Sequence, residues 1–160
     1  MIEKLTVLAD AFENNGKIPR EHTGFGADTS PAFTLPDLKE EVVSIAIIMD
    51  DLDIPFRKQY NHWVIWNIPR MTKIPANIPY GPMVPSLDNA IQGMGYGKNR
   101  YRGPKQPFFI HSRHRYLFQF YGFDCKFAFD STTTKKKLMD AMQGHILQQG
   151  SIMGTYKRGE

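Results

Sequence analysis

The segment from His114 to Phe123 constrains the fold most strongly, because its large side chains recur at every second position. In a β-strand, Tyr116, Phe118 and Phe120 would share one face, since successive side chains point to opposite faces. His114 belongs to that face, at the point where the strand begins. A histidine in this position is either a hydrogen-bonded core imidazole or part of the wall of a pocket.

Two other apolar segments predict strands in the centre of a sheet. They are VVSIAIIMDD, from Val42 to Asp51, and HWVIWNIP, from His62 to Pro69. Both faces of each segment are apolar, which is typical of a strand that is covered on both sides. The first segment ends in aspartates and the second begins with a histidine, so ionisable side chains stand at the ends of predicted core strands.

One helix is predicted, within TTTKKKLMDAMQGHILQQG at residues 132–150. Apolar residues from Leu138 to Ile146 recur at helical spacing, a threonine can cap the beginning, and Gly150 stands beyond the expected end. Gly144 inside a helix costs about 1 kcal/mol relative to alanine, which predicts a closely packed neighbour. The chain is therefore predicted to be mainly β with a C-terminal helix.

The totals predict a single domain, residues 1–160, located in the cytoplasm. A chain of 160 residues can bury a substantial core without added cross-links. Its only cysteine, Cys125, has no partner for an internal disulfide, and the N-terminus lacks the apolar run of a secretory signal. The longest apolar stretch, Val42–Met49, is far shorter than the roughly 20 residues needed for a transmembrane segment. The segment Met71–Lys105 is rich in glycine and proline and predicts a long, irregular connection.

Basic residues are concentrated in one part of the chain. Lysine and arginine exceed aspartate and glutamate only by 20 to 16, so no nucleic-acid partner is expected. Between Asn89 and Phe123, however, there is no acidic residue. The basic residues of this span are Lys98, Arg100, Arg102, Lys105, Arg113 and Arg115. The span is either a solvated basic face or a surface that attracts an anion.

Polar side chains that suit a binding site stand at the ends of the three predicted core strands. If Asp51, His62 and His114 converge, Asp51 can accept a hydrogen bond from an imidazole, fix its tautomer and favour its charged form. The other imidazole and the Tyr116 hydroxyl would then offer hydrogen bonds to an oxygen-rich ligand. Asp53 also suits the ordinary role of a strand-end aspartate in a turn.

Four segments of the chain, in order, resemble the phosphatidylethanolamine-binding protein (PEBP) family, in the bacterial and archaeal branch often called Raf-kinase-inhibitor-like. They are DDLDIP, HWVIWNIP, YRGPKQP and HRYLFQFYGFD. GKIPREHTGFGADTSPAF near the beginning and LMDAMQGHILQQGSIMGTYKR at the end extend the similarity over nearly the whole chain. The resemblance implies a large antiparallel sheet packed against a smaller one, a helix near the C-terminus, and a small pocket for phosphate-type anions.

The resemblance also implies which residues bind the ligand. The family's D-x-D-x-P motif matches Asp51, Asp53 and Pro55, and its histidine before the W-V strand matches His62. Its G-P pair matches Gly103 and Pro104, and its H-R-Y motif matches His114, Arg115 and Tyr116. Of these, all except Arg115 are expected to form the site, with backbone amides around Gly103 completing it.

One departure from the family pattern lies in the loop Lys105–Arg113, which is lengthened and ends in Arg113 where the family has glycine. The change bears on the shape of the pocket rim and on the size of the ligand. His111 belongs to this loop and ranks below His114 as a ligand-binding residue.

The predicted function is that of a binding protein, not an enzyme, for a phospholipid head group, a phosphorylated metabolite or a phosphorylated residue. No metal or cofactor is expected, while regulation of a partner protein and the oligomeric state, including a homodimer, stay open. The alternative is an enzyme in which two histidines and one carboxylate hold a metal, or in which the histidines act as acid and base. Against it, no serine or cysteine is placed as a nucleophile.

Overall fold

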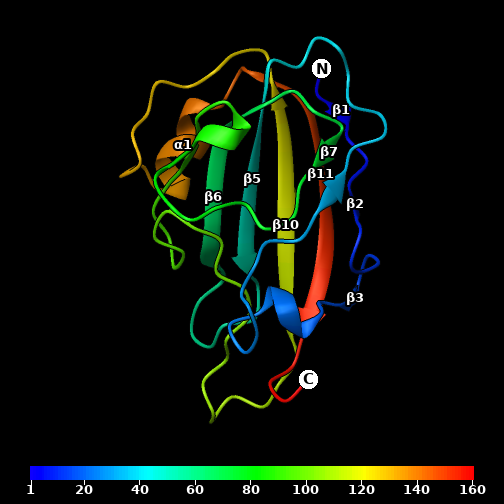
Figure 1. Ribbon diagram of the computed structural model, residues 1–160, viewed down its shortest axis with the longest axis vertical. Coiled ribbons are helices and arrows are strands. Elements are labelled where there is room, and N and C mark those ends of the chain that lie inside the picture. The colour runs from blue at the N-terminus through cyan, green and yellow to red at the C-terminus, as the bar shows by residue number, and fades with distance from the viewer.

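The computed structural model describes residues 1–160 as two β-sheets, one α-helix and connecting loops (Figure 1). The strands are β1 (Glu3–Lys4), β2 (Leu8–Ala9), β3 (Gly16–Lys17), β4 (Phe33–Thr34), β5 (Ser44–Asp51), β6 (Tyr60–Pro69), β7 (Lys73–Ile74), β8 (Met83–Val84), β9 (Ala90–Gln92), β10 (His114–Phe123) and β11 (Ile146–Tyr156). The helices are η1 (Arg20–His22), η2 (Pro85–Leu87) and α1 (Lys135–Ala141). None of them has the length and apolar character needed to cross a membrane.

The large sheet has the strand order β1-β11-β10-β5-β6-β9-β8, and β3 also pairs with β11. Its neighbours from β11 to β8 are antiparallel, whereas β1 and β3 add to β11 in parallel. The small sheet has the antiparallel order β2-β4-β7. The predicted fold class, mainly β with a large and a smaller sheet and a helix near the C-terminus, is confirmed.

Different elements cover the two faces of the large sheet. On one face, the ring of Phe33 in β4 lies 5.4 Å from that of Phe118 and 4.9 Å from that of Phe120, between ring centroids. On the other face, Leu138 of α1 belongs to the same buried cluster as Trp66 of β6. Burying an aliphatic or aromatic side chain of this size contributes about 1.5–3 kcal/mol. Because the central strands are covered on both sides, their sequences are apolar on both faces.

The C-terminal helix is shorter than the sequence pattern predicted. Its beginning is as expected, because the Thr134 side chain accepts a hydrogen bond from the backbone N–H of Lys137. Ile146, which the pattern placed on the helix, instead begins β11 and pairs with Phe123 of β10. Since β11 lies between β1 and β10, backbone pairing on both sides outweighs the helical spacing of its first residues.

Two glycines show why the helix prediction was wrong beyond α1. Gly144 lies in the turn after the helix with a φ of +83°, a conformation that glycine adopts without strain. Nothing lies within 4 Å of the place where its Cβ would be, so the close packing expected against Gly144 is absent. Gly150 lies within β11, where a Cβ would overlap the backbone carbonyl oxygen of Leu5. Its role is a close approach between neighbouring strands and not the end of a helix.

The predicted core strands form as β5, β6 and β10, and the glycine- and proline-rich connection contains only the short elements β7, β8, η2 and β9. The end of β5 and the beginnings of β6 and β10 lie at one end of the large sheet, the lower end in Figure 1. In this register Asp51 of β5 lies between Tyr116 of β10 and Tyr60 of β6. The sheet therefore positions the predicted polar side chains beside one another.

Candidate functional site

A cavity of about 460 Å³ opens where β5, β6 and β10 meet. Among the predicted ligand-binding residues, those that line it are Asp51, Pro55, His62, His114 and Tyr116. Asp53, Gly103 and Pro104 do not line it. The strand ends thus converge as predicted, while the loop residues have other positions.

Asp51 and His114 form a buried pair in the wall of the cavity. Nδ1 of His114 lies 2.8 Å from Oδ2 of Asp51, and the backbone N–H of Asp53 donates to Oδ1 of Asp51 at 2.8 Å. Because a carboxylate only accepts hydrogen bonds, Nδ1 carries a proton. The opposite nitrogen, Nε2, is buried and has no hydrogen-bond partner in the protein. The pair therefore fixes the ring and leaves one nitrogen for a ligand.

His62 is held by the backbone on the facing side of the cavity. Its Nδ1 donates to the carbonyl oxygen of Arg102 at 2.8 Å, so Nε2 is again the free nitrogen. Burial lowers the pKa of His62 below its ordinary value, although the Arg102 carbonyl and the charge of Asp51 oppose this effect. At neutral pH the cavity wall therefore contains a neutral His62 imidazole.

Aromatic rings surround the two histidines. Tyr116 lies between them, with ring centroids 5.5 Å from His62 and 6.4 Å from His114. Burial, followed by the charge of Asp51, raises the pKa of Tyr116 well above its ordinary value, so its hydroxyl keeps its proton. Tyr96 and Tyr60 also lie edge-on to His62, at 5.0 and 5.7 Å. Sequence reasoning missed these two, because Tyr60 precedes the apolar run that begins at His62 and Tyr96 lies in the glycine-rich connection.

Asp53 shapes the rim instead of lining the cavity. Its carboxylate accepts hydrogen bonds from the guanidinium of Arg115 at 2.8 and 2.9 Å and from the Arg115 backbone N–H at 2.8 Å. This pairing with Arg115 holds the pKa of Asp53 below its usual value. As predicted from strand alternation, Arg115 points away from the face that carries His114 and is exposed. The pair ties the turn after β5 to the beginning of β10.

The expected contribution of Gly103 amides to the pocket is corrected by the structure. The Gly103 N–H donates to Oδ1 of Asp28 at 2.8 Å, so it is not free to bind a ligand. A Cβ at Gly103 would overlap the carbonyl oxygen of His22, and the Pro104 carbonyl accepts from the N–H of Gly24. Gly103 and Pro104 thus join the loop to the N-terminal segment. Asp28, distant in sequence, gave no signal that could have predicted this contact.

The lengthened loop Lys105–Arg113 forms one wall of the cavity. The loop residues that line it are Lys105, Gln106, Pro107, Phe109 and Ile110. His111 is exposed and does not line it, in agreement with its lower rank. Phe56, from the turn after β5, lines the cavity on the other side and is exposed, as is Phe109. The departure from the family pattern therefore falls on the rim.

The acid-free span does not form a continuous basic face, because acidic residues from elsewhere pair with its arginines. Arg100 binds Asp28 at 2.8 Å, Arg113 binds Glu160, and Arg115 binds Asp53. Within the cavity the cationic side chains are Lys105 from this span and Arg57 from the turn after β5. Most arginines of the span are therefore engaged in ion pairs within the protein and add little net positive charge to the cavity.

Comparison with known proteins agrees with this fold and site. The family model described as phosphatidylethanolamine-binding protein matches residues 9–157. A UPF0098 protein of Archaeoglobus fulgidus is 39% identical over 159 residues, which is 99% of this chain and 53% of the relative. The chain thus spans about half the length of that relative. A UPF0098 protein of Methanothermobacter thermautotrophicus is 36% identical over 157 residues, with 97% of this chain and 100% of the relative covered.

Two solved structures share the architecture. A putative PEBP homolog from Chlamydia trachomatis superposes with a TM-score of 0.83 at 26% identity, covering 98% of this chain and 99% of the other. YbcL of Escherichia coli, described as a new member of the mammalian PEBP family, gives a TM-score of 0.82 at 22% identity, covering 96% and 98%, and shows the fold alone. The family match extends over nearly the whole chain, and the protein belongs to the phosphatidylethanolamine-binding protein family.

Proposed function

We propose that the protein binds a small phosphate-type anion in this cavity and does not convert it chemically. The observation that carries the proposal is Nε2 of His114, which is buried in the cavity wall without a hydrogen-bond partner. An unpaired buried polar atom costs free energy, and a ligand oxygen would supply the missing partner. A protonated phosphate would donate to a neutral Nε2, and an imidazolium would donate to a phosphate oxygen.

Other groups of the cavity can complete the binding of an anion. Nε2 of His62 faces away from the Arg102 carbonyl, and the protonated Tyr116 hydroxyl is a donor. The side chains of Arg57 and Lys105 add positive charge at the rim. Hydrogen bonds to charged groups contribute about 1.5–3 kcal/mol each, so a few of them give measurable affinity without a metal.

The dimensions of the cavity suit a phosphate that carries a further group. A volume of about 460 Å³ exceeds what a bare phosphate needs, and exposed rings of Phe56 and Phe109 stand at the rim. A phospholipid head group, a phosphorylated metabolite and a phosphorylated residue share the phosphate chemistry. Binding of a phosphorylated residue would imply regulation of a partner protein.

The geometry favours binding over a metal-dependent reaction. Asp51, His62 and His114 do not bring one ligand atom each within 4.8 Å of one another, as a shared metal ion would require. Both oxygens of Asp51 accept hydrogen bonds within the protein, one from Nδ1 of His114 and the other from the N–H of Asp53. The carboxylate thus orients His114 toward a ligand.

Imidazole nitrogen NMR during titration with inorganic phosphate tests the proposal. The resonances of His62 and His114 should move together, while those of His22 and His145, which lie outside the cavity, should not. Parallel titrations with phosphoethanolamine, a glycerophosphate and a phosphoserine peptide identify the preferred carrier. Resonance shifts confined to His22 or His145 would contradict this location, and release of inorganic phosphate from any carrier would establish the enzyme alternative.

A further inference from the structure

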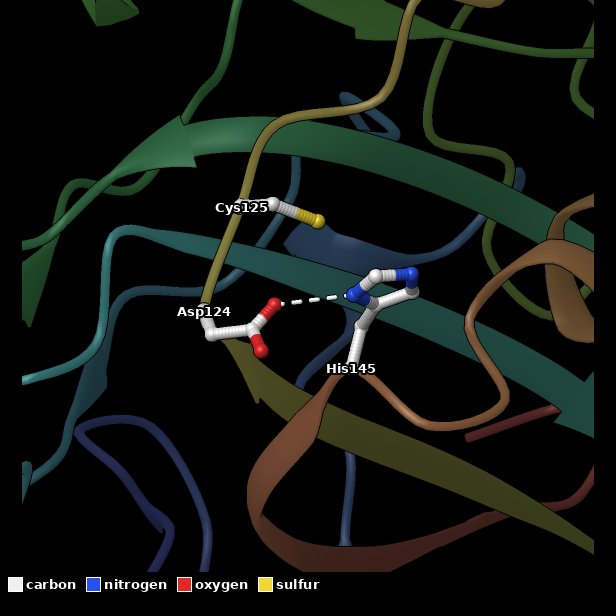
Figure 2. A group of neighbouring side chains, drawn as sticks. All are labelled: Asp124, Cys125 and His145. Atoms are coloured by element: carbon white, nitrogen blue, oxygen red, sulfur yellow. Dashed lines mark hydrogen bonds and ion pairs between the residues drawn. The ribbon is translucent and has the colours of Figure 1, made fainter.

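A second group of functional side chains lies at the opposite end of β10 from the cavity. β10 begins at His114 and ends at Phe123, and its 10 residues span about 30 Å at the usual rise per residue. Asp124 and Cys125 follow directly after the strand, and His145 precedes β11. Figure 2 shows the Cys125 sulfur and the Asp124 carboxylate turned toward the imidazole of His145.

The three side chains offer converging ligand atoms. One ligand atom from each lies within 4.8 Å of those from the other two. Nδ1 of His145 lies 2.9 Å from Oδ1 of Asp124, the contact drawn as a dashed line in Figure 2. A half-exposed pair of this kind contributes little to stability. The thiol of Cys125, the next residue after Asp124, adds a sulfur ligand atom to this pair.

The surrounding structure holds these residues in place. The backbone N–H of Asp124 donates to the carbonyl oxygen of His145 at 3.0 Å, so the two ligands are joined through backbone as well as side chains. The carbonyl oxygen of Cys125 accepts from the hydroxyl of Ser44, which is buried. The ring of Phe127 packs edge-on against His145 at 6.0 Å between centroids. The positions of the ligands are thus fixed by the fold.

We propose that Asp124, Cys125 and His145 bind a thiophilic divalent cation, with Zn²⁺ as the best match. Cysteine sulfur, histidine nitrogen and a carboxylate oxygen are the ligands that zinc uses, and three protein ligands leave a fourth position for water. Zinc bonds of about 2.0–2.3 Å require the three side chains to close slightly around the ion. The double positive charge offsets the charges of the carboxylate and the thiolate.

Metal binding requires that Cys125 lose its thiol proton and that the proton on Nδ1 of His145 be replaced by one on Nε2. The Cys125 thiol loses its proton to solvent and donates a sulfur lone pair to the ion. Nδ1 of His145 leaves its hydrogen bond with Asp124, and its proton is replaced by one on Nε2, so that Nδ1 can bind the metal. Asp124 then ligates through the oxygen that had accepted that hydrogen bond. The side chains of Asp124 and His145 are each 46% exposed, which lets the ion and the protons reach the site.

Cobalt titration of the purified, metal-free protein tests the site. Cys125 is the only cysteine of the chain, so a thiolate-to-cobalt charge-transfer band can report no other residue. We expect the band at a ratio of one Co²⁺ per chain and its loss when Zn²⁺ displaces the cobalt. Cys125→Ser should abolish the band, and His145→Gln or Asp124→Asn should weaken cobalt binding at least tenfold.

Matched controls separate this site from the cavity and from misfolding. His111→Gln replaces an exposed histidine elsewhere, and Asp51→Asn alters the cavity, so both variants should bind cobalt as the unmodified protein does. An absent band, or unchanged affinity in a folded His145→Gln variant, would overturn the proposal. If His145→Gln does not fold, alkylation of Cys125 in the unmodified protein tests the site instead. Equimolar Zn²⁺ should slow alkylation of Cys125 at least tenfold, and an unchanged rate would refute the site.

Discussion

Replacing His114 by alanine should remove most of the affinity for phosphate. The variant deletes Nε2, the one buried nitrogen of the cavity wall that has no partner in the protein. A hydrogen bond between a charged ligand and such a group contributes about 1.5–3 kcal/mol, and each 1.4 kcal/mol corresponds to a factor of about ten. His114→Ala should therefore weaken phosphate binding by about 10- to 150-fold.

The same substitution should also destabilise the fold through Asp51. Oδ2 of Asp51 loses the His114 proton at 2.8 Å, while Oδ1 keeps the backbone N–H of Asp53. Leaving a buried acceptor without its partner costs about 1–3 kcal/mol, and more for a charged group. For a chain of this length each 1 kcal/mol lowers Tm by about 2–4 °C. We therefore expect a fall in Tm of several degrees.

A second variant separates the two effects. In Asp51→Asn/His114→Ala the buried charge is gone, and the side-chain carbonyl can still accept from the Asp53 N–H. Its Tm should recover part of the loss, because no buried charge is left without a partner, whereas phosphate binding should stay weak. Calorimetric titration with inorganic phosphate, together with thermal unfolding, measures both quantities. His111→Ala is the matched control and should change neither, since His111 is exposed and does not line the cavity.

The result that would refute this reasoning is specific. If His114→Ala binds phosphate with unchanged affinity and only its Tm falls, then His114 is a core imidazole and the anion binds elsewhere. If His111→Ala loses phosphate binding, the lengthened loop supplies the ligand contact.

Three further outcomes are expected. Arg115→Ala should lower Tm at pH 7 without weakening phosphate binding; because Arg115 lowers the pKa of Asp53 from 3.8, the difference in Tm should shrink as the pH falls below that value. Because burial lowers the pKa of His62 from 6.5, its contribution to stability should be full above pH 6.5 and decline below it, and phosphate binding should take up a proton, which calorimetry in two buffers would measure. Gly150→Ala should cost about 1–3 kcal/mol in urea unfolding, because its Cβ would overlap the carbonyl oxygen of Leu5.

The core strands could be predicted from the sequence because burial on both faces leaves a local pattern. The end of the helix could not, because the pairing that converts Ile146 into the first residue of β11 is with Phe123, which is distant in sequence. Helical spacing of apolar residues continues past Gly144 in the sequence, but its φ of +83° ends the helix before that spacing does. The spacing of apolar residues indicates which residues are buried, but it does not indicate which strand their backbone pairs with.

The site shows the same division between local and distant contacts. Asp51, His62 and His114 were predictable because polar residues at the ends of neighbouring core strands lie together at one end of the sheet. Gly103 was misjudged because its amide is bound by Asp28, a contact between residues 75 positions apart. The convergence of Cys125 with His145 followed from no sequence pattern, because the two residues are brought together by the ends of different strands.

The pairing of charges indicates how the cavity would select its ligand. Arg100 and Arg115 are each bound to an acidic residue, so their fields are largely cancelled at distances beyond the first neighbour. Attraction of an anion must therefore depend on short-range hydrogen-bonding groups inside the cavity, above all the two imidazoles, whose Nδ1 atoms are held by the Arg102 carbonyl and by Asp51. Such groups favour a ligand that reaches them, because hydrogen bonds weaken steeply with distance and angle. Selectivity among phosphorylated ligands then depends on the rim, where the lengthened loop limits the size of the group that is attached to the phosphate.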